Sequence, residues 1–167
     1  MSFKEITAKQ INKNAIELIA DEWALVAAGD KNGSNMMTVS WGFFGEMWGK
    51  DCVIAMIRPQ RYTIEFLNKH DHFALCFMGE NNPVHKICGS VSGRDTDKLS
   101  ATGLTPIYNF DTVFYEQARQ VLICKKIYTD EIKESGFIDK DCLKWYKDKD
   151  FHRVFIGQIE KVLIKED

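Results

Sequence analysis

From Trp23 onwards, short apolar, β-branched or aromatic stretches alternate with polar turns. The turns read GDKNGSN, GEMWGKD, NKHD and GENNP, and residues of these types favour tight changes of chain direction. Each apolar stretch has the length and residue types of a β-strand. The pattern therefore predicts strands in WALVAAGD, MMTVSWGFF, DCVIAMI, HFALCFM, ARQVLICKKIY and FHRVFIGQIEKVLI.

Helical segments are few and short. Residues 11–21 place their apolar side chains on one face, which predicts an amphipathic helix. YTIEFLNKH, PVHKICGSV and TDKLSATGL are also predicted to be helical, and the last of them should end at Gly103. Because no helix of crossover length separates most neighbouring strands, the sheet should be largely antiparallel. The predicted fold class is mainly β (α+β), an antiparallel barrel with a few short flanking helices.

Composition limits the partners and the cellular setting. The chain has 167 residues, of which 45% are hydrophobic, and it contains no linker, so we expect a single domain over residues 1–167. The formal net charge is −2 and the basic residues are scattered, which argues against binding to nucleic acid or to an anionic membrane. The five cysteines have no CxxC spacing, which favours a reducing cytoplasm. No apolar run approaches the roughly 20 residues of a membrane span, so we expect a soluble cytoplasmic protein.

The stretch NMMTVSW, residues 35–41, places hydroxyl side chains where an ordinary core strand would carry valine or isoleucine. Strand alternation puts Thr38 and Ser40 on one face, and Met37 and Trp41 on the other. One face is therefore polar enough to meet a ligand, and backbone groups could join in if the strand lies at a rim. A strand with one solvated face is the alternative interpretation.

The stretch IRPQRYT, residues 57–63, follows a predicted buried strand with two arginines. Pro59 favours an extended Arg58, which ends the strand, and Thr63 can then cap the next helix. Together with the helix end, Arg58 and Arg61 would form an anion site suited to phosphate. The segment lacks the glycines and the GK[ST] ending of a P-loop. A charged turn with an ordinary cap remains the alternative.

SVSGRDTDK, residues 90–98, is a second hydroxyl-rich turn before a helix. Ser92 and Lys98 could form another wall of the same anion site. Asp95 and Asp97 offset the positive charge of this turn, and Asp97 is well placed to cap the helix that follows. Taken alone, this segment is better interpreted as a helix cap.

The histidines do not form a recognisable metal site, so no metal site is predicted. His152 heads the last predicted strand, with Arg153 next to it, so it could lie at the mouth of a barrel. A structural histidine is the alternative. The charged tract at residues 139–150 is expected to be a solvated surface insertion rather than a lid. Motifs of classical dinucleotide-binding proteins, serine hydrolases and zinc peptidases are missing from the sequence.

The sequence resembles the flavin reductase-like or flavoredoxin-like family of FMN-binding split β-barrels. The resemblance rests on four segments in this order: NMMTVSWG, WGKDCVIAMIRPQRYT, SGRDTDK and FHRVFIGQI. The resemblance spans roughly Trp23 to Ile164. It implies bound FMN and a homodimer with the flavin near the subunit interface. It also implies flavin-ring contacts at Asn35, Met37, Thr38, Ser40 and Trp41, and phosphate contacts at Arg58, Arg61, Tyr62, Thr63, Lys98 and Ser92.

Within this family, Phe151 stands where flavin reductases that use NADH or NADPH commonly carry an acidic residue, so the pattern is closer to the flavoredoxin-like branch. The implied function is transfer of hydride or electrons from NADH, NADPH or a protein donor through FMN to flavin, a metal complex or a redox partner. His152 and Arg153 would orient the donor or acceptor. The alternatives are a non-catalytic FMN-binding storage or sensor protein, and an interaction barrel without a cofactor.

Overall fold

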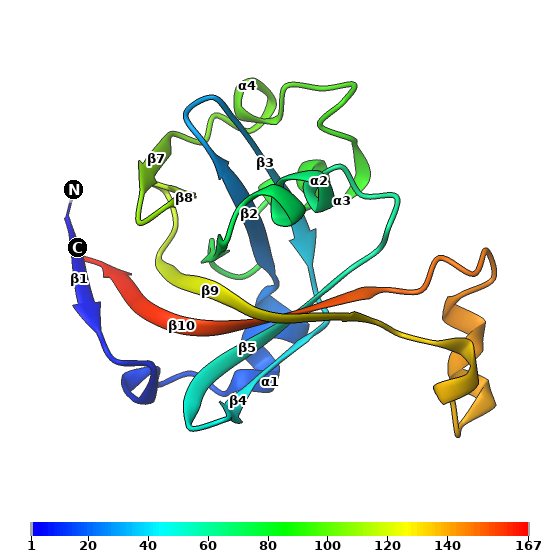
Figure 1. Cartoon of the computed structure of the whole chain (residues 1–167). Coiled ribbons are helices and arrows are strands. Elements are labelled where there is room, and N and C mark those ends of the chain that lie inside the picture. The colour runs from blue at the N-terminus through cyan, green and yellow to red at the C-terminus, as the bar shows by residue number, and fades with distance from the viewer. Residues whose placement is uncertain (1, 167) are drawn as a thin grey trace.

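The two longest strands, β9 (Gln120–Glu131) and β10 (Arg153–Lys165), run antiparallel through the middle of the protein (Figure 1). The structure is a computed structural model that describes residues 2–166. Along its other edge, β10 pairs first with β5 (Lys50–Ile57) and then with β1 (Phe3–Ile6). The last strand of the sequence therefore joins three others.

The remaining strands complete an eight-stranded sheet in which every pairing is antiparallel. Its order is β3-β2-β6-β9-β10-β5-β4, and β1 pairs with β10 off this path. The flanking strands are β2 (Ala24–Asp30), β3 (Gly33–Val39), β4 (Gly42–Met47) and β6 (His72–Phe77). This arrangement confirms the predicted antiparallel, mainly β class.

The inner strands are apolar throughout because both of their faces are covered. In β2, Val26 packs into the core enclosed by the curved sheet, whereas Leu25 packs into a second core on the outer face. The second core is closed by α3 (Val84–Ser90) and by the hairpin of β7 (Pro106–Asn109) and β8 (Thr112–Tyr115). Burial on both faces accounts for unbroken stretches such as HFALCFM.

A bend in β10 lets it pair with strands in both halves of the sheet. The register of β9 against β10 shifts between Ile156 and Gly157 and again between Ile159 and Lys161. A Cβ atom at Gly157 would lie 2.6 Å from the ring of Phe73 and 2.9 Å from Cβ of Cys124. Only glycine fits at this position, because the neighbouring strands pack directly against the backbone.

Three of the predicted helices are confirmed: α2 (Thr63–Lys69), α3 and α4 (Lys98–Thr102). Asp97 caps α4 by accepting hydrogen bonds from the backbone N–H groups of Leu99 and Ser100, as predicted. The cap predicted at Thr63 is wrong. Thr63 is the first residue of α2, and its hydroxyl accepts a hydrogen bond from the side chain of Asn35 instead.

Other predicted boundaries are also corrected. The helix expected over residues 11–21 is reduced to α1 (Ala15–Glu17) and a π-helical turn, Leu18–Glu22. The strand expected over residues 36–44 is broken between β3 and β4, where Ser40 and Trp41 turn the chain. Strands β1, β7 and β8 were not predicted. Short 3-10 helices occur at Ala8–Gln10, Glu134–Gly136 and Lys140–Trp145.

The segment between β9 and β10 projects from one end of the sheet (Figure 1) and then returns to it. The prediction that residues 139–150 form only a solvated insertion is wrong in one respect. Most of these residues are exposed, but Tyr146 is buried and Trp145 packs against Trp41. The end of the tract is therefore part of the packed structure.

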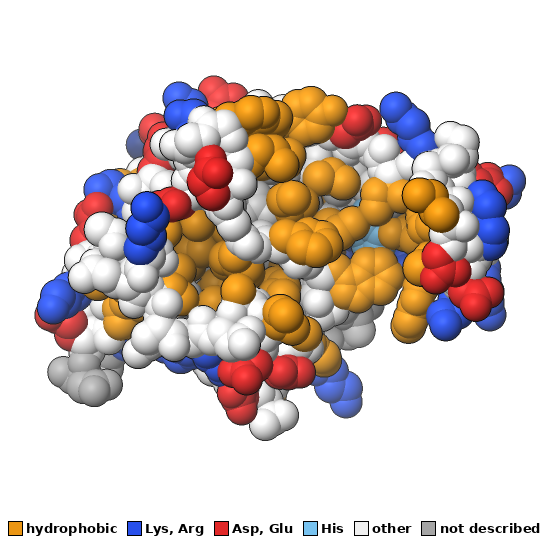
Figure 2. Space-filling view, turned by 90° about the horizontal axis from the view of Figure 1, so that it is seen from below, with side chains coloured by type: hydrophobic (Ala, Val, Ile, Leu, Met, Phe, Trp, Pro, Cys, Tyr) orange, Lys and Arg blue, Asp and Glu red, His pale blue; other side chains and the backbone are white. Residues whose placement is uncertain are grey.

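Hydrophobic side chains are also gathered on the outside of the protein. Figure 2 shows them spread across the face that carries β4 and α1. Among them, Ile16 of α1 is 73% exposed and Phe43 of β4 is 63% exposed. No helix among residues 2–166 is both long and apolar enough to cross a membrane.

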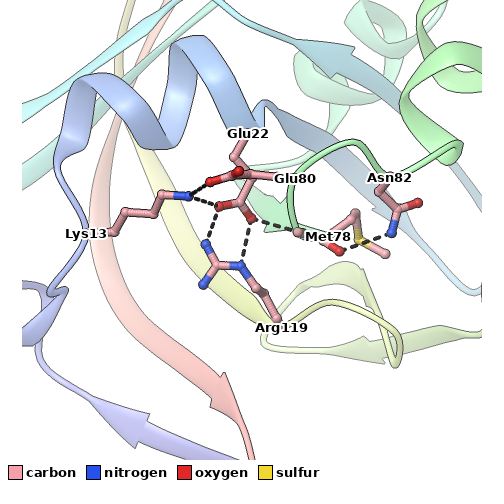
Figure 3. Close-up of polar contacts among 7 residues, drawn as sticks. Lys13, Glu22, Met78, Glu80, Asn82 and Arg119 are labelled. Carbon is pink, nitrogen blue, oxygen red and sulfur yellow. Dashed lines mark hydrogen bonds and ion pairs between the residues drawn. The ribbon is translucent and has the colours of Figure 1, made fainter.

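A buried carboxylate fixes the π-helical turn to the sheet (Figure 3). Glu22 accepts two hydrogen bonds from Arg119, one from Lys13 at 3.1 Å and one from the backbone N–H of Gly79 at 3.0 Å. Its side chain is fully buried. Burial acts to raise the pKa of Glu22, but these hydrogen bonds outweigh it and hold the pKa below the ordinary value.

Candidate functional site

The site is built along β3, which ends the sheet and so has one unpaired edge. The Nζ atom of Lys98 donates to the backbone carbonyl of Met36 at 2.8 Å, so this carbonyl faces the open side of β3. In an antiparallel strand the residue two positions further on points its backbone groups the same way. The N–H and C=O of Thr38 therefore face the open edge as well.

The first hollow beside this edge has a volume of about 360 Å³. It is bounded by β3, the end of β5, the end of α3 and the returning tract 139–150. Its lining combines apolar, hydroxyl, aromatic and basic side chains: Met37, Thr38, Val39, Ser40, Trp41, Met56, Arg58, Arg61, Gly89, Trp145 and His152. Because it holds all but one of the residues expected to contact the flavin ring, we refer to it as the ring hollow.

His152 lies buried in the wall of the ring hollow. Its Nδ1 atom lies 2.8 Å from the hydroxyl of Tyr146, and its ring centroid lies 5.0 Å from that of Trp41. Burial, and secondarily the positive charge of Arg58, lower the pKa of His152 from 6.5 to about 4. His152 is therefore a neutral hydrogen-bonding group at pH 7, not a cation.

Arg58 also lines the ring hollow, but its charge is already compensated. Its Nη1 atom donates to Asp150 at 2.5 Å, and its Nη2 atom donates to the backbone carbonyl of Trp145 at 2.9 Å. Gln60 donates to the same carboxylate at 2.7 Å. The geometry does not support the prediction that Arg58 contacts the phosphate, because Asp150 holds the guanidinium in the ring hollow.

A second hollow of about 210 Å³ adjoins the first, with which it shares Met37 and Arg61. It lies between the start of α2 and the loop that joins α3 to α4. Its lining is mostly polar: Asn35, Met37, Gln60, Arg61, Tyr62, Thr63, Ser90, Val91, Ser92, Gly93 and Lys98. The structure thus brings together five of the six residues expected to contact the phosphate, and we refer to this site as the cation hollow.

The two cations of this hollow have no acidic partner. Lys98 is only 5% exposed and donates to the backbone carbonyls of Met36 and Cys88. Arg61 donates to the backbone carbonyls of Cys88 and Gly89. Among residues 2–166, no carboxylate pairs with either side chain. Burial lowers the pKa of both groups, and the charge of Arg61 lowers that of Lys98 further.

The neutral walls of the cation hollow are tightly fitted. Asn35 donates from its side chain to the hydroxyl of Thr63 at 2.9 Å, and both residues are buried. A Cβ atom at Gly93 would lie 2.2 Å from Oδ1 of Asn35 and 3.1 Å from the ring of Tyr62. Glycine is thus required where the loop meets this wall. Ser92 accepts a hydrogen bond from the backbone N–H of Arg94 at 3.1 Å.

One predicted residue lies apart from both hollows. Arg153 donates to the side chain of Asn68 at 3.1 Å and lines neither hollow. Successive side chains of an extended chain point in opposite directions, so Arg153 faces away when His152 faces the ring hollow. The geometry therefore does not support the expected role of Arg153.

Sequence reasoning missed several residues of the site. Trp145 and Met56 line the ring hollow, and Val91 lines the cation hollow. A signal for Trp145 was present in the sequence, since the pair Trp145–Tyr146 is aromatic within the otherwise charged tract 139–150. No comparable signal marked Met56, which belongs to an ordinary apolar strand.

Comparison with known proteins identifies the fold. A search of curated proteins found no match. Among solved structures, the flavoredoxin of Desulfovibrio vulgaris (Miyazaki F) is 18% identical, with a TM-score of 0.68 over 96% of this chain and 78% of that one. An FMN-binding protein from Thermus thermophilus, solved with bound 1-cyclohex-2-enone, is 19% identical, with a TM-score of 0.64 over 95% and 79% of the respective chains.

A third solved structure is a protein with a split barrel domain from Shewanella frigidimarina NCIMB 400, assigned as a flavin reductase. It is 18% identical, with a TM-score of 0.68 over 96% of this chain and 80% of that one. These likenesses confirm that the antiparallel sheet is a split barrel. The model of the flavin reductase like domain matches residues 17–167. Since this match covers most of the sequence, the chain belongs to the flavin reductase-like family.

Proposed function

We propose that this chain binds FMN with the phosphate in the cation hollow and the flavin ring in the ring hollow. The observation that carries the proposal is the pair of buried cations, Arg61 and Lys98, which within residues 2–166 bond only to backbone carbonyls. A buried charge without a partner of opposite sign is unfavourable, and two like charges in one hollow are more so. A phosphate group would offset both charges and accept hydrogen bonds from both side chains.

The remaining walls also suit a phosphoryl ester. Thr63 and Ser92 bring hydroxyl groups to the cation hollow, and Gly93 lets the loop pack closely against Asn35 in its wall. The two hollows meet at Met37 and Arg61, so one elongated ligand can occupy both. FMN has this form, with a phosphate at one end of a flexible chain and a planar ring at the other.

The ring hollow would position the flavin through groups of this chain. The outward-facing backbone of Thr38 and the hydroxyl of Ser40 would bond the polar edge of the ring, while Trp41 and Met56 provide apolar surface. Bound FMN would supply hydride or electron transfer, and the protein would supply position and exclusion of water. His152 would orient the incoming donor or acceptor as a neutral group, since Tyr146 holds its ring in place.

In this proposal the protein is an oxidoreductase. Electrons come from NADH, NADPH or a protein donor and pass through FMN to flavin, a metal complex or a redox partner. The rival is an FMN-binding storage or sensor protein, which would have the same phosphate and ring contacts. Anaerobic addition of NADH or NADPH to the FMN-loaded protein separates a nicotinamide-dependent enzyme from a storage protein, because only the enzyme loses its yellow colour.

We also propose a homodimer in which the second subunit lies near the ring hollow. An apolar hollow of about 480 Å³ adjoins the ring hollow at Ser40, Trp41 and Met56, and includes the exposed residues Ile16 and Phe43. Exposed apolar surface of this kind favours a protein contact. A partner seated there would cover the open side of the flavin ring.

The phosphate assignment is tested by comparing FMN with riboflavin, which lacks the phosphate. Arg61→Ala should weaken FMN binding by about ten- to a hundredfold, the loss expected for one charge-assisted contact, and leave riboflavin binding nearly unchanged. Arg58→Ala is the matched control, because Arg58 lies in the ring hollow and should affect both ligands alike. Equal weakening of FMN and riboflavin by Arg61→Ala would contradict the assignment.

A further inference from the structure

A third hollow, with a volume of about 550 Å³, lies beside Thr38 and Ser40 and adjoins the cation hollow at Ser90. It shares Thr38, Ser40 and Gly89 with the ring hollow, so a ligand in it would lie beside the flavin ring. Its other lining residues are Trp23, Asn81, Asn82, Pro83, His85, Lys86 and Ser90. The only charged residue among them is Lys86, which is exposed, so the interior suits an uncharged ligand.

His85 is the unexplained residue of this hollow. It is 4% exposed, and neither of its ring nitrogens has a hydrogen-bond partner among residues 2–166. The other buried histidine, His152, is bonded to Tyr146. Buried polar groups in folded proteins are nearly always hydrogen-bonded, so two unpaired nitrogens on one buried ring suggest a ligand that would pair with one of them.

The surroundings of His85 hold it in place and in its neutral form. Its backbone carbonyl accepts a hydrogen bond from the hydroxyl of Thr38 at 2.8 Å. Burial lowers the pKa of its imidazole, so the ring is neutral at pH 7. A neutral imidazole carries one N–H donor and one nitrogen acceptor. It can therefore bond an oxygen atom that is a carbonyl in one state of a ligand and a hydroxyl in another.

Trp23 gives this hollow a planar aromatic wall. Its ring lies edge-on to that of His85, with 6.0 Å between the centroids, and it is 41% exposed. Its indole N–H is already bonded to the carbonyl of Ala20 at 2.8 Å, so the ring offers apolar surface rather than a further donor. Both nitrogens of His85 are out of contact with solvent. A ligand would reach them only after a shift of the side chains that cover them.

We propose that this third hollow binds a small uncharged para-quinone, the electron acceptor of the proposed flavoprotein. The N–H of His85 would donate to a carbonyl of the quinone, and its other nitrogen would accept from a hydroxyl of the hydroquinone. The quinone gains two electrons and two protons from the reduced flavin and becomes the hydroquinone, which leaves oxidised flavin. The role as acceptor rests on the proposed function, whereas the binding site rests on His85 and its surroundings.

The test is a calorimetric titration with duroquinone, whose fully substituted ring does not add to the exposed thiol of Cys142. His85→Phe should weaken duroquinone binding about three- to tenfold, the effect of one lost hydrogen bond. His85→Gln, which keeps a donor and an acceptor, should weaken it less than twofold. His72→Phe is the matched control, because His72 lies outside the hollow and bonds Glu160.

FMN affinity is measured in the same variants, so that the two proposals can fail separately. If FMN binds normally while His85→Phe leaves duroquinone binding unchanged, the quinone site is wrong and the proposed function stands. Competition between FMN and duroquinone would also overturn the quinone site, because the third hollow would then belong to the flavin. If FMN does not bind at all, the proposed function is wrong, and the dependence on His85 still decides the quinone site.

Discussion

Arg58 and Arg61 lie three positions apart, yet their charges have opposite surroundings. Arg58 faces Asp150 in the ring hollow, and Arg61 faces only backbone carbonyls where the two hollows meet. An ion pair on the rim of a site supports local structure, whereas a half-buried cation without an acid attracts an anion. The two arginines therefore differ in the hydrogen-bond partners of their guanidinium groups, although the residue type is the same.

At the same scale, His152 should stay neutral at pH values far below the pKa of an ordinary histidine. A proton–nitrogen NMR titration should place its midpoint near pH 4, since burial and the charge of Arg58 oppose protonation. In Arg58→Met the midpoint should rise, because the like charge is removed. A midpoint near 6.5 in the unaltered protein would contradict the buried, hydrogen-bonded position of the ring.

This depressed pKa has a consequence for stability. Between pH 6.5 and about 4, the unfolded chain binds a proton at His152 that the folded chain does not. The free energy of unfolding should therefore decrease as the pH falls through this window. His152→Asn should reduce the slope measured by urea unfolding, and the remaining slope includes the contribution of His85, whose pKa is lowered in the same direction.

Local sequence indicated part of this residue-level arrangement. IRPQRYT and SGRDTDK marked Arg61 and Lys98 as candidates, because both segments combine basic and hydroxyl residues. The local sequence could not show that Arg61 and Arg58 have different roles. Asp150, the residue that neutralises Arg58, is 92 positions away from it. For the same reason, Arg153 was grouped with His152 although the two side chains diverge in space.

Among the elements, the tract 139–150 contains a short 3-10 helix and lies directly at the site. Its chain returns to the sheet through three attachments: Trp145 against Trp41, Tyr146 to His152, and Asp150 to Arg58. It thereby forms one wall of the ring hollow. Composition alone suggested solvent exposure, because charged residues outnumber the aromatic ones that make these contacts.

Asp150→Asn should loosen this tract without unfolding the barrel. The carboxylate accepts from both Arg58 and Gln60, so its removal should lower the free energy of unfolding by about 1 kcal/mol. Hydrogen–deuterium exchange should become faster within residues 139–150. Asp148→Asn is the control, because the exposed Asp148 makes no hydrogen bond to any of residues 2–166 and should leave exchange unchanged.

Strands buried on both faces were the elements that sequence predicted best. β2 and β6 appear as unbroken apolar stretches because each separates two cores. The break between β3 and β4 was missed, since Ser40 and Trp41 continue a strand-like pattern while the tertiary structure turns the chain there. The hairpin of β7 and β8 was missed because its packing partners, β2 and β6, are far away in the sequence.

For the whole molecule, the Glu22 carboxylate connects distant parts of the chain. It joins the π-helical turn to the end of β6 through Gly79 and to the start of β9 through Arg119. Glu22→Gln should lower the free energy of unfolding by about 2–3 kcal/mol, because charged hydrogen bonds at a buried site are lost. Urea unfolding measures this change.

Glu80→Gln is the matched control, since Glu80 is exposed and, in the described part of the chain, its side chain bonds only to Lys13. It should lower the free energy of unfolding by less than about 1 kcal/mol. The folded pKa of Glu22 lies below its ordinary value, so its contribution is present above pH 4.5 and is lost as the pH falls through the folded pKa. Equal effects of the two substitutions would show that the buried network is not stabilising.

The proposed dimer makes a prediction at the same scale. Phe43→Lys places a charge in the apolar hollow and should shift the mass measured by light scattering from dimer to monomer. Trp48→Lys is the control, because Trp48 is similarly exposed but lies outside that hollow. A monomeric unaltered protein, or a dimer that tolerates Phe43→Lys, would contradict this interface.

The position of β10 has a consequence for how the chain is assembled during synthesis. β10 leaves the ribosome after β9, β5 and β1, and it pairs with all three of them. Until it emerges, the half of the sheet that contains β5 and β4 has no backbone pairing to the half that contains β6 and β9. Since His152 directly precedes β10, the ring hollow takes shape only once β10 has emerged, and a nascent chain that stalls before this point exposes unpaired strand edges.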